Sequence, residues 1–473
     1  MDEPPAALKQ ASILRRALEE TGLVSMYFST RDVKLLCLQR FVRMFAYGIS
    51  TLVLVAYLDA LGNPKTAIGL FMTLTLVGDI CISFFLTLFA DALLMSASGV
   101  VFALSASYWV LLAAAVVGVI SPSGNEIGPF RAVEESIVAQ LTDPRSRSDV
   151  YAWYGLLGPV GTACGCMVCG WVLQHLTETL RWDFVRAYRA IYFGYAVLGL
   201  LKLTLTLLLS HSTESEKKQL ERAQARDDET RPLFSGNTEA SPHKKRGIRA
   251  MLPEMSKESI PVVVTLCLVF ALDSFGSGLA PLSWITYYFK YQFDIEEGKL
   301  GSIFFVTQTL SGVSIIVASS LAKRFGNVNT MVFTALPSQV FRALIAVPGD
   351  VRLALVFLVL NSSTQAMDVA PRSAFLATIV LPGERTAVMG TVNVVKTTAQ
   401  SLGPILTGFL VDRDLFWVSF LSSGGLKILY NLGLLAFFKE KEKEREKAER
   451  LRIEREEEQR RGQGDSQAVE TRV

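Results

Sequence analysis

Long apolar runs divided by short polar segments constrain the fold of this chain more than any other feature. Half of its 473 residues are hydrophobic and 19% are charged. A helix that crosses ~30 Å of hydrocarbon needs roughly 20 mostly apolar residues. Runs such as Thr66–Ala90 and Leu415–Phe438 reach that length. We therefore predict an all-α membrane protein, and the small net charge of +3 gives no reason to expect a nucleic-acid partner.

The apolar runs divide into twelve predicted transmembrane helices, six in each half of the chain. The first six are Lys34–Leu58, Thr66–Ala90, Leu93–Ser107, Tyr108–Arg131, Val150–Leu173 and Ala187–Leu209. The last six are Ile260–Tyr288, Leu300–Leu321, Val328–Val347, Leu353–Arg372, Thr386–Leu410 and Leu415–Phe438. Two six-helix bundles, 34–209 and 258–438, are therefore expected.

Polar segments flank and separate the two bundles. The tail 1–33 and the charged tail 439–473 lie at the ends, and the linker 210–257 is rich in Lys, Arg, Glu and Ser. Such a linker cannot bury enough apolar surface to fold alone, so we predict that it is disordered. Lysine and arginine gather in the linker and in the loops on the same side as both tails, which predicts that both termini are cytosolic. The plasma membrane and the vacuolar membrane remain alternatives.

The two halves repeat each other in sequence. One fixed offset relates Arg43 to Asp273 and Gly48 to Gly278. Further matches, in the same order along the chain, are Thr73-Leu-Thr-Leu-Val-Gly78 with Thr307-Gln-Thr-Leu-Ser-Gly312, Pro144-Arg-Ser-Arg147 with Pro382-Gly-Glu-Arg385, and Gly158-Pro159 with Gly403-Pro404. Weak internal repeats with an even number of spans per half are typical of secondary transporters.

Several of these residues resemble motifs of the major facilitator superfamily. Leu88-Phe-Ala-Asp91 resembles the start of its loop motif between the second and third spans, and Leu321-Ala-Lys-Arg-Phe-Gly326 resembles the counterpart between the eighth and ninth. Gly155-Leu-Leu-Gly-Pro159-Val-Gly161 is similar to the Gly-Pro motif of drug:proton antiporters. The resemblance covers almost the whole chain outside the linker and tails. It implies two six-helix bundles around a central cavity that opens to one side at a time.

The resemblance also implies roles for individual residues. Loop and gating positions are Asp91, Arg147, Lys323, Arg324, Gly326 and Arg385, and helix-packing positions are Gly158, Pro159, Gly403 and Pro404. One departure concerns the third span, because Asp91 continues directly into apolar sequence without the basic residues of the family motif. The third helix, truncated near 91–107, has its predicted span at Leu93–Ser107, which is only ~22 Å long and too short for ~30 Å of hydrocarbon. Either a stretch of the chain is missing here, or the gating role of this loop is lost.

Two opposite charges lie near the middle of related helices in the two halves. They are Arg43 in the first span and Asp273 in the seventh. A charge at the bilayer centre costs roughly 2.5 kcal/mol or more, so residues of this kind are functional candidates by default. As a pair they can bind a zwitterionic solute, form an internal ion pair that substrate or a proton breaks, or hold the bundles together.

Acid–base pairs around a proline recur in the fourth and tenth spans. They are Glu126 with Arg131 and Asp368 with Arg372. A spacing of four or five residues puts both charges near one face of a helix. The intervening proline can free backbone groups toward a cavity. These pairs are predicted either to contact substrate or to form a cytosolic gate.

Single polar side chains in other spans complete the candidate set. Asp79 can carry a coupling proton, or it hydrogen-bonds to a neighbouring helix. Gln308 and Gln365 add groups that can contact substrate. Lys396 in the eleventh span ranks lower, because the family resemblance implies a cavity lined by the first, fourth, seventh and tenth spans.

The function predicted from these features is secondary active transport of a small solute, with protons as the candidate coupling ion. We expect a monomer in the lipid bilayer, with no cofactor and no metal. A membrane-embedded enzyme is disfavoured, because the three histidines lie at span ends or in the linker and offer no Ser–His or His–acid arrangement. A solute sensor or scaffold on a transporter fold, with the charged tail as its output, remains the alternative.

Overall fold

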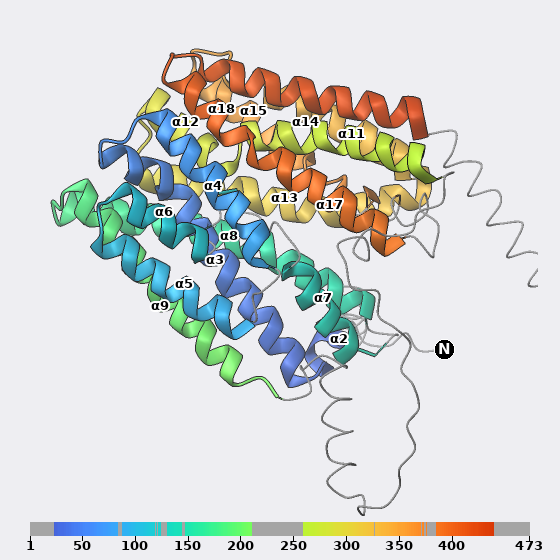
Figure 1. Ribbon diagram of the computed structural model, residues 1–473, viewed down its shortest axis with the longest axis horizontal. Coiled ribbons are helices and arrows are strands. Elements are labelled where there is room, and N and C mark those ends of the chain that lie inside the picture. The colour runs from blue at the N-terminus through green and yellow to red at the C-terminus, as the bar shows by residue number, and fades with distance from the viewer. Residues whose placement is uncertain are drawn as a thin grey trace, which may run out of the picture. The chain divides into compact units, whose positions relative to one another are not determined.

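A computed structural model describes residues 23–83, 88–118, 120, 122–123, 130–143, 147–210, 259–325, 327–369, 371–372, 375 and 385–438. Within these ranges the chain forms helices and turns, and it contains no strand. The predicted all-α fold is confirmed. Figure 1 shows the helices with their labels.

The first half of the chain contributes nine helical segments in the described ranges. They are α2 (Leu23–Phe28), α3 (Arg31–Ala60), α4 (Lys65–Ser83), α5 (Leu88–Leu104), α6 (Tyr108–Val117), α7 (Phe130–Leu141), α8 (Arg147–Gln174), the π-helix η1 (His175–Thr179) and α9 (Phe184–Leu207). Side-chain caps fix two of the starts. Thr30 accepts from the Val33 N–H at the start of α3, and Asp183 accepts from the Val185 N–H at the start of α9.

The second half contributes seven labelled helices and one final helix. They are α11 (Ser259–Leu279), α12 (Leu282–Phe293), α13 (Glu297–Phe325), α14 (Asn327–Leu344), α15 (Val351–Thr364), α17 (Arg385–Ser401), α18 (Gly403–Val411) and Phe416–Phe438. Two predicted spans are interrupted: the seventh between α11 and α12, and the eleventh between α17 and α18. A proline lies at each break. Pro281 directly precedes α12, and Pro404 lies in the first turn of α18.

Five helices in the described ranges are long and apolar enough to cross a membrane. They are Arg31–Ala60, Asp149–Thr179, Phe184–Leu207, Ile260–Phe293 and Phe416–Phe438. Shorter apolar helices are Leu88–Leu104, Tyr108–Val117 and Val351–Thr364. Several other predicted spans include residues outside the described ranges, so the count of twelve stays a prediction.

The third span differs from the boundaries expected for it. We predicted that the second span runs to Ala90 and that the third begins at Leu93, whereas α4 ends at Ser83 and α5 begins at Leu88. The third helix therefore draws the expected loop residues, including Asp91, into its own first turn. With 17 residues it spans about 25 Å, still short of ~30 Å of hydrocarbon.

The chain divides into two compact units that cut across its two sequence halves. Unit 1 contains Met1–Leu252, Ser277–Gly312 and Gln400–Ser419, and unit 2 contains Pro253–Gly276, Val313–Ala399 and Phe420–Val473. One border falls between Leu252 and Pro253, and the other four fall inside α11, α13, α17 and the last helix. Each of these helices belongs to both units.

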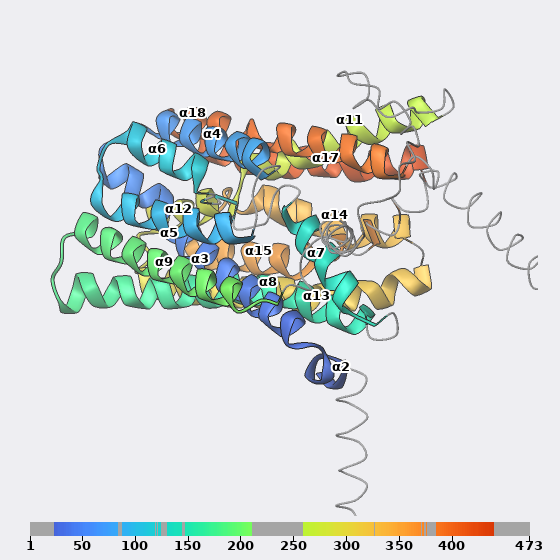
Figure 2. The same cartoon turned by 60° about the horizontal axis from the view of Figure 1, so that its bottom comes forward.

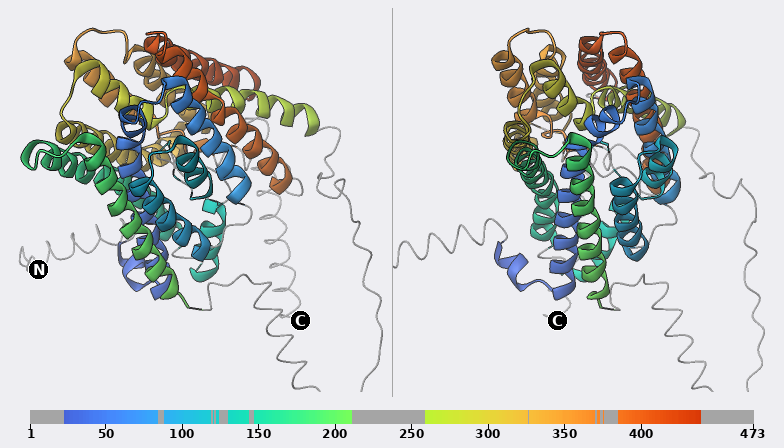
Figure 3. Two further views of the ribbon diagram at one scale, coloured as in Figure 1. Left: turned by 60° about the vertical axis from the view of Figure 1, so that its left-hand side comes forward. Right: turned by 90° about the vertical axis from the view of Figure 1, so that its left-hand side faces the viewer.

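Within unit 1, α3 is the central helix. It packs against α8 and α9, and α9 also packs against α5 (Figures 1 and 3). Gly48 of α3 allows close contact with α8, because a Cβ at this position would meet the backbone of Thr162 and Cys166. The Cys166 thiol lies 3.3 Å from the Gly48 carbonyl oxygen. Small residues therefore set the distance between these helices, as in other membrane bundles.

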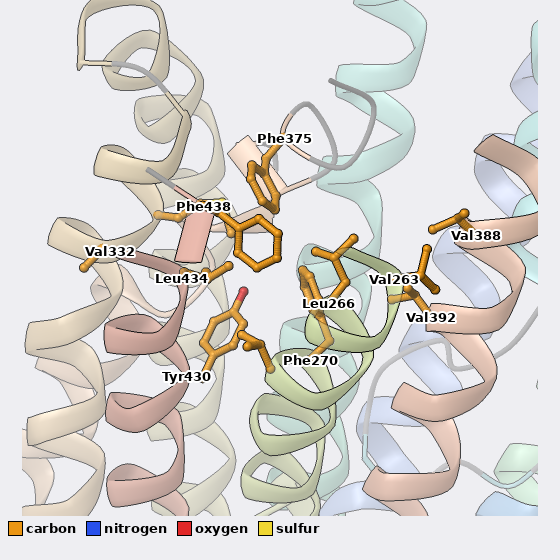
Figure 4. Close-up of a cluster of buried hydrophobic side chains, with 12 residues drawn as sticks. Val263, Leu266, Phe270, Val332, Phe375, Val388, Val392, Tyr430, Leu434 and Phe438 are labelled. Carbon is orange, nitrogen blue, oxygen red and sulfur yellow. The ribbon is translucent and has the colours of Figure 1, made fainter. Parts of the chain in front are cut away.

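The core of unit 2 is an apolar cluster between α11, α14, α17 and the last helix. Figure 4 shows Phe270 of α11 beside Tyr430 and Leu434 of the last helix, with Val388 and Val392 contributed by α17. The ring centroids of Phe270 and Tyr430 are 5.6 Å apart. This cluster borders the charged side chains of the unit, which are described next.

Candidate functional site

A buried ion pair joins three helices in unit 1. The two terminal guanidinium nitrogens of Arg43 (α3) donate to Glu134 (α7), over 3.0 Å to Oε1 and 2.6 Å to Oε2. The Tyr154 hydroxyl (α8) donates to the same Oε2 over 2.5 Å. The side chains of Arg43 and Glu134 are each 1% exposed. A bidentate, charge-assisted pair of this kind holds its two side chains in one geometry.

A second buried ion pair in unit 1 joins Lys202 of α9 to Asp91 of α5. Both side chains are buried. The family resemblance assigned Asp91 to a cytosolic loop. The structure instead places it inside a helix and pairs it with a neighbouring helix of the same unit.

Unit 2 holds a larger cluster of charged side chains around Asp273 of α11. Lys427 of the last helix donates to Asp273 Oδ1 over 2.6 Å, and Arg372 donates to Oδ2 over 3.1 Å. Arg372 also pairs with Asp368. The sequence pair Asp368–Arg372 is therefore in contact, and Asp273 joins it through the arginine.

Two more cations lie in the same cluster. Arg342 of α14 donates through Nε to the Ser423 hydroxyl over 2.8 Å, and that hydroxyl donates to the Gly276 carbonyl oxygen. Lys396 of α17 lies 5.6 Å from the centre of the Phe270 ring. The Arg372 guanidinium lies at the same distance from this ring, so both cations are within cation–π range of Phe270.

The two halves hold related ion pairs with the signs exchanged. The sequence repeat relates Arg43 to Asp273, and the separation that relates Pro144 to Pro382 also relates Glu134 to Arg372. Arg43–Glu134 in unit 1 and Asp273–Arg372 in unit 2 are thus the same pair with charge reversed. Arg43 and Asp273 each have a charged partner in their own unit, and the roles expected of the two residues as a pair stay predictions.

A glycine-lined seam joins the first-half helices to second-half segments inside unit 1. We define it by Gly69, Gly170, Gly301 and Gly408. A Cβ at Gly301 of α13 would meet the Cys166 carbonyl and Gly170 Cα of α8, and a Cβ at Gly408 of α18 would meet the backbone of Lys65 and Gly69 of α4. Figure 2 shows α18 alongside α4.

Polar contacts lie along the glycine seam. The Thr286 hydroxyl of α12 donates to the Thr51 carbonyl of α3 over 3.0 Å, and the Ile405 N–H donates to the Thr73 hydroxyl over 3.1 Å. The Trp171 indole donates to the Ser302 hydroxyl over 3.0 Å. Backbone contact at glycines together with these hydrogen bonds brings three first-half helices against the second half.

Asp412 caps a helix across this seam. Its carboxylate accepts the Lys65 N–H over 2.9 Å and the Thr66 N–H over 2.7 Å, at the start of α4, and also accepts from the Thr66 hydroxyl. Partial burial acts to raise the pKa of Asp412, but these hydrogen bonds outweigh it and hold the pKa below its ordinary value of 3.8. The carboxylate is therefore charged at neutral pH and complements the positive end of α4.

Comparison with known proteins agrees with this helical repeat. The family model of the Major Facilitator Superfamily matches residues 36–282 and 265–461. An uncharacterized membrane protein of Saccharomyces cerevisiae is 36% identical over 428 residues, which cover 87% of this chain and 94% of the relative. This chain belongs to the Major Facilitator Superfamily. The resemblance noted in the sequence is confirmed, and the narrower likeness to drug:proton antiporters stays a prediction.

Solved transporters of the Major Facilitator Superfamily type share the fold at low sequence identity. A D-xylose–proton symporter superposes with a TM-score of 0.63 at 14% identity, covering 86% of this chain and 98% of the symporter. The inward open xylose transporter XylE from E. coli gives 0.61 at 13% identity, covering 86% of this chain and 96% of XylE. These matches support a multi-pass membrane transporter fold and do not identify a substrate for this chain.

The remaining predicted site residues of this superfamily member fall into three groups. Asp79 of α4, Gln308 of α13 and Gln365 are half-buried, and Arg324 is exposed at the end of α13. Gln365 accepts from the Asn361 amide over 3.3 Å, beside α14. Glu126 and Gly326 lie outside the described residues, as do the side chains of Arg131, Arg147, Lys323 and Arg385.

The predicted helix-packing residues lie in close contacts. Gly403 lies against the Gly278 backbone, and Pro159 lies beside Gly312. The Pro404 carbonyl oxygen lies against Gly69, and the Arg40 guanidinium lies against Gly158. The contact of Gly48 with α8 and the contact of Gly278 with Gly403 are related by the sequence repeat. They agree with the internal repeat of a superfamily transporter.

Sequence reasoning missed three partners in these networks, Glu134, Lys202 and Lys427. Lys202 and Lys427 lie inside predicted spans, so the rule that singled out Arg43 should have included them. Glu134 was missed because the fourth span was ended at Arg131, and α7 continues to Leu141.

Proposed function

We propose that this superfamily member is a secondary active transporter that moves a small solute by alternating access. The observation that carries the proposal is the glycine seam. Helices of the first half meet α12, the start of α13 and α18 through backbone contacts inside unit 1. A close-packed, discrete interface between repeat-related halves is what a two-state gate requires.

The seam is assigned to the extracytosolic gate. The distribution of Lys and Arg predicts that both termini are cytosolic. The loops next to the seam follow α3, α8 and α18, which end the predicted first, fifth and eleventh spans, so these loops lie on the extracytosolic side. The buried ion pairs of the two units then hold the helices that move as bodies. The fold neighbours include a transporter described as inward open, and alternating access requires a closed extracytosolic gate in a state of that kind.

Proton coupling is assigned to Asp79. It lies half-buried on α4, the helix whose start Asp412 caps across the seam. A carboxylate placed between packed helices can change its protonation when the helices rearrange. Asp273 is less suited to this role, since it already forms ion pairs with Lys427 and Arg372.

Uptake into proteoliposomes tests the proposal. Purified full-length chain is reconstituted with an imposed pH gradient, and solutes of different charge are offered. We expect accumulation of at least one solute, and loss of its pH dependence in Asp79→Asn with uptake down a gradient retained. Absence of uptake for every solute class would overturn the transport proposal, and unchanged pH dependence in Asp79→Asn would overturn the assignment of Asp79.

A sensor on a transporter fold is the second candidate, favoured by the charged tail 439–473. A chain that ends after Phe438 separates the two. A transporter without the tail should retain its uptake rate in vesicles, whereas a sensor should bind solute without uptake and should lose its cellular output with the tail.

A further inference from the structure

The charged cluster of unit 2 carries more positive than negative charge. Its cations are Arg342, Arg372, Lys396 and Lys427, and its carboxylates among the described residues are Asp273 and Asp368. The other described carboxylate of unit 2, Asp350, caps α15 instead. Within the described part of the unit, the cluster therefore has an excess of two positive charges.

The buried charges of unit 1 show no such positive excess. Among its described side chains, the buried cations are Arg40, Arg43 and Lys202, and the buried carboxylates are Asp32, Asp91, Glu134 and Glu297. Charges buried in a low-dielectric interior are costly unless they are paired. The excess in unit 2 is therefore a specific property of that unit.

Arg372 and Lys396 are the more exposed cations of the cluster. Arg372 is 18% exposed, while its partner Asp273 is 6% exposed. Lys396 is half-buried, and it lies beside Phe270 without an ion pair within the described part of the chain. Asp273 and Lys427 thus form the buried base of the cluster, and Arg372 and Lys396 form its accessible part.

Two buried polar atoms at the cluster lack hydrogen-bond partners in the described part of unit 2. They are the Tyr430 hydroxyl and Arg372 Nε. Tyr430 is 1% exposed, and its ring lies 5.7 Å from the Arg372 guanidinium. Figure 4 shows Tyr430 next to Phe270, in the apolar cluster that borders these charges. Buried donors without partners are costly, so they indicate a group that is bound there in another state.

We propose that this cluster binds a small solute carrying a carboxylate or phosphate group, with Arg372 and Lys396 contacting that group. The planar guanidinium of Arg372 matches the oxygens of either group. Lys396 supplies a second, point-like charge, and Phe270 and Tyr430 offer apolar surface to the rest of the solute. This names the substrate class of the transporter and rests on the proposed function only for translocation, because binding itself requires no transport.

Binding is tested on the full-length chain in lipid nanodiscs by thermal stability at fixed ionic strength. The probes are inorganic phosphate and succinate, with tetraethylammonium as a cationic and glucose as a neutral control. We expect phosphate or succinate to raise the unfolding midpoint in a saturable manner, and the responding probe distinguishes a phosphate site from a carboxylate site. Neither control should do so.

Three variants locate the binding site. Lys396→Gln should raise the half-saturating concentration of the responding anion by about tenfold or more, since one charge-assisted contact is lost. Lys396→Arg should keep it within about threefold, because the charge is retained. Lys299→Gln makes the same charge change at a position that is 66% exposed in unit 1, and it should leave binding unchanged.

The outcomes separate this inference from the proposed function. Protection by neither anion, protection by glucose or tetraethylammonium, or equal anion binding in Lys396→Gln and Lys299→Gln would each overturn the anion site. Anion binding that depends on Lys396 without uptake in vesicles would support the site and count against transport. Uptake of a neutral or cationic solute that Lys396→Gln does not alter would support transport and overturn the site.

Discussion

At the scale of single residues, the geometry of the Arg43–Glu134 pair decides what its loss would cost. Both side chains are buried, and Glu134 accepts three hydrogen bonds, two from Arg43 and one from Tyr154. Removing one partner of such a pair leaves a buried charge without compensation.

We therefore expect Glu134→Gln to lower the free energy of unfolding by about 3–5 kcal/mol. The measurement is thermal or denaturant unfolding in detergent, followed by fluorescence. Glu296→Gln is the matched control, because Glu296 pairs with Lys299 at the surface with 47% of its side chain exposed, and exposed pairs contribute about 1 kcal/mol or less. Equal losses in the two variants would show that the Arg43–Glu134 pair contributes no special stability.

The Asp412 cap predicts a pH dependence with a defined sign. Its pKa is held below the ordinary value of 3.8 in the folded chain, so its stabilisation is present above that value and is lost as the pH falls through the lower folded value. Asp412→Ala should lower stability by at most about 1 kcal/mol at pH 7, because the site is exposed to water. The difference from the natural chain should persist at pH 5 and narrow only below about pH 4. A difference that vanished already between pH 7 and 5 would contradict this cap.

The sequence identified the residues of these networks better than their partners. The rule that charges are costly in the bilayer found Arg43, Asp273, Asp368 and Arg372, and all four lie in buried or half-buried ion pairs. It did not show that Arg43 meets Glu134 rather than Asp273. Pairing depends on how helices rotate against each other, and hydrophobic periodicity is a weak guide to rotation when most faces of a helix are apolar.

At the scale of helices, the glycine seam predicts a strong difference between two glycines. A Cβ at Gly301 would meet the backbone of α8, whereas a Cβ at Gly155 of α8 meets nothing within 4 Å. Gly301→Ala should therefore push α13 from α8, lower the unfolding free energy by about 1–3 kcal/mol and reduce uptake. Gly155→Ala should be neutral or slightly stabilising, since alanine favours a helix by about 1 kcal/mol over glycine. Stability and vesicle uptake of both variants test this, and equal behaviour would contradict a close-packed seam.

Helix positions were largely predictable from apolar runs, but helix interruptions were not. The seventh span was expected to be continuous from Ile260 to Tyr288, and α11 instead gives way to α12 around Pro281. Pro404 begins α18 in the same way. A proline inside an apolar run is compatible with a kink, a break or a continuous helix, and the packing of its neighbours decides among them. For the short third span, the sequence placed Asp91 in the preceding loop, whereas α5 includes it in its first turn.

At the scale of the whole molecule, the internal repeat was visible in sequence, but the two compact units were not. The repeat places its boundary in the linker at 210–257, whereas four of the five unit borders fall within helices of the second half. Two of these borders directly follow Gly276 and Gly312. The sequence repeat indicates that the two halves share a common origin. The compact units instead indicate which segments are in contact, and the two divisions need not coincide.

The composition of unit 1 sets an order of assembly on the ribosome. Residues 277–312 and 400–419 complete a unit whose other helices have all been synthesised by residue 210. Until residue 301 has been translated, Gly170 faces lipid or a chaperone instead of protein. Until residue 412 has been translated, the same holds for Gly69, and the start of α4 lacks its cap. A fragment that ends within 211–258 should therefore be degraded rapidly when it is expressed alone. Coexpression with the complementary fragment should rescue it, and Gly301→Ala in that second fragment should weaken the rescue, whereas a stable, protease-resistant first fragment would show that its helices need no later partner.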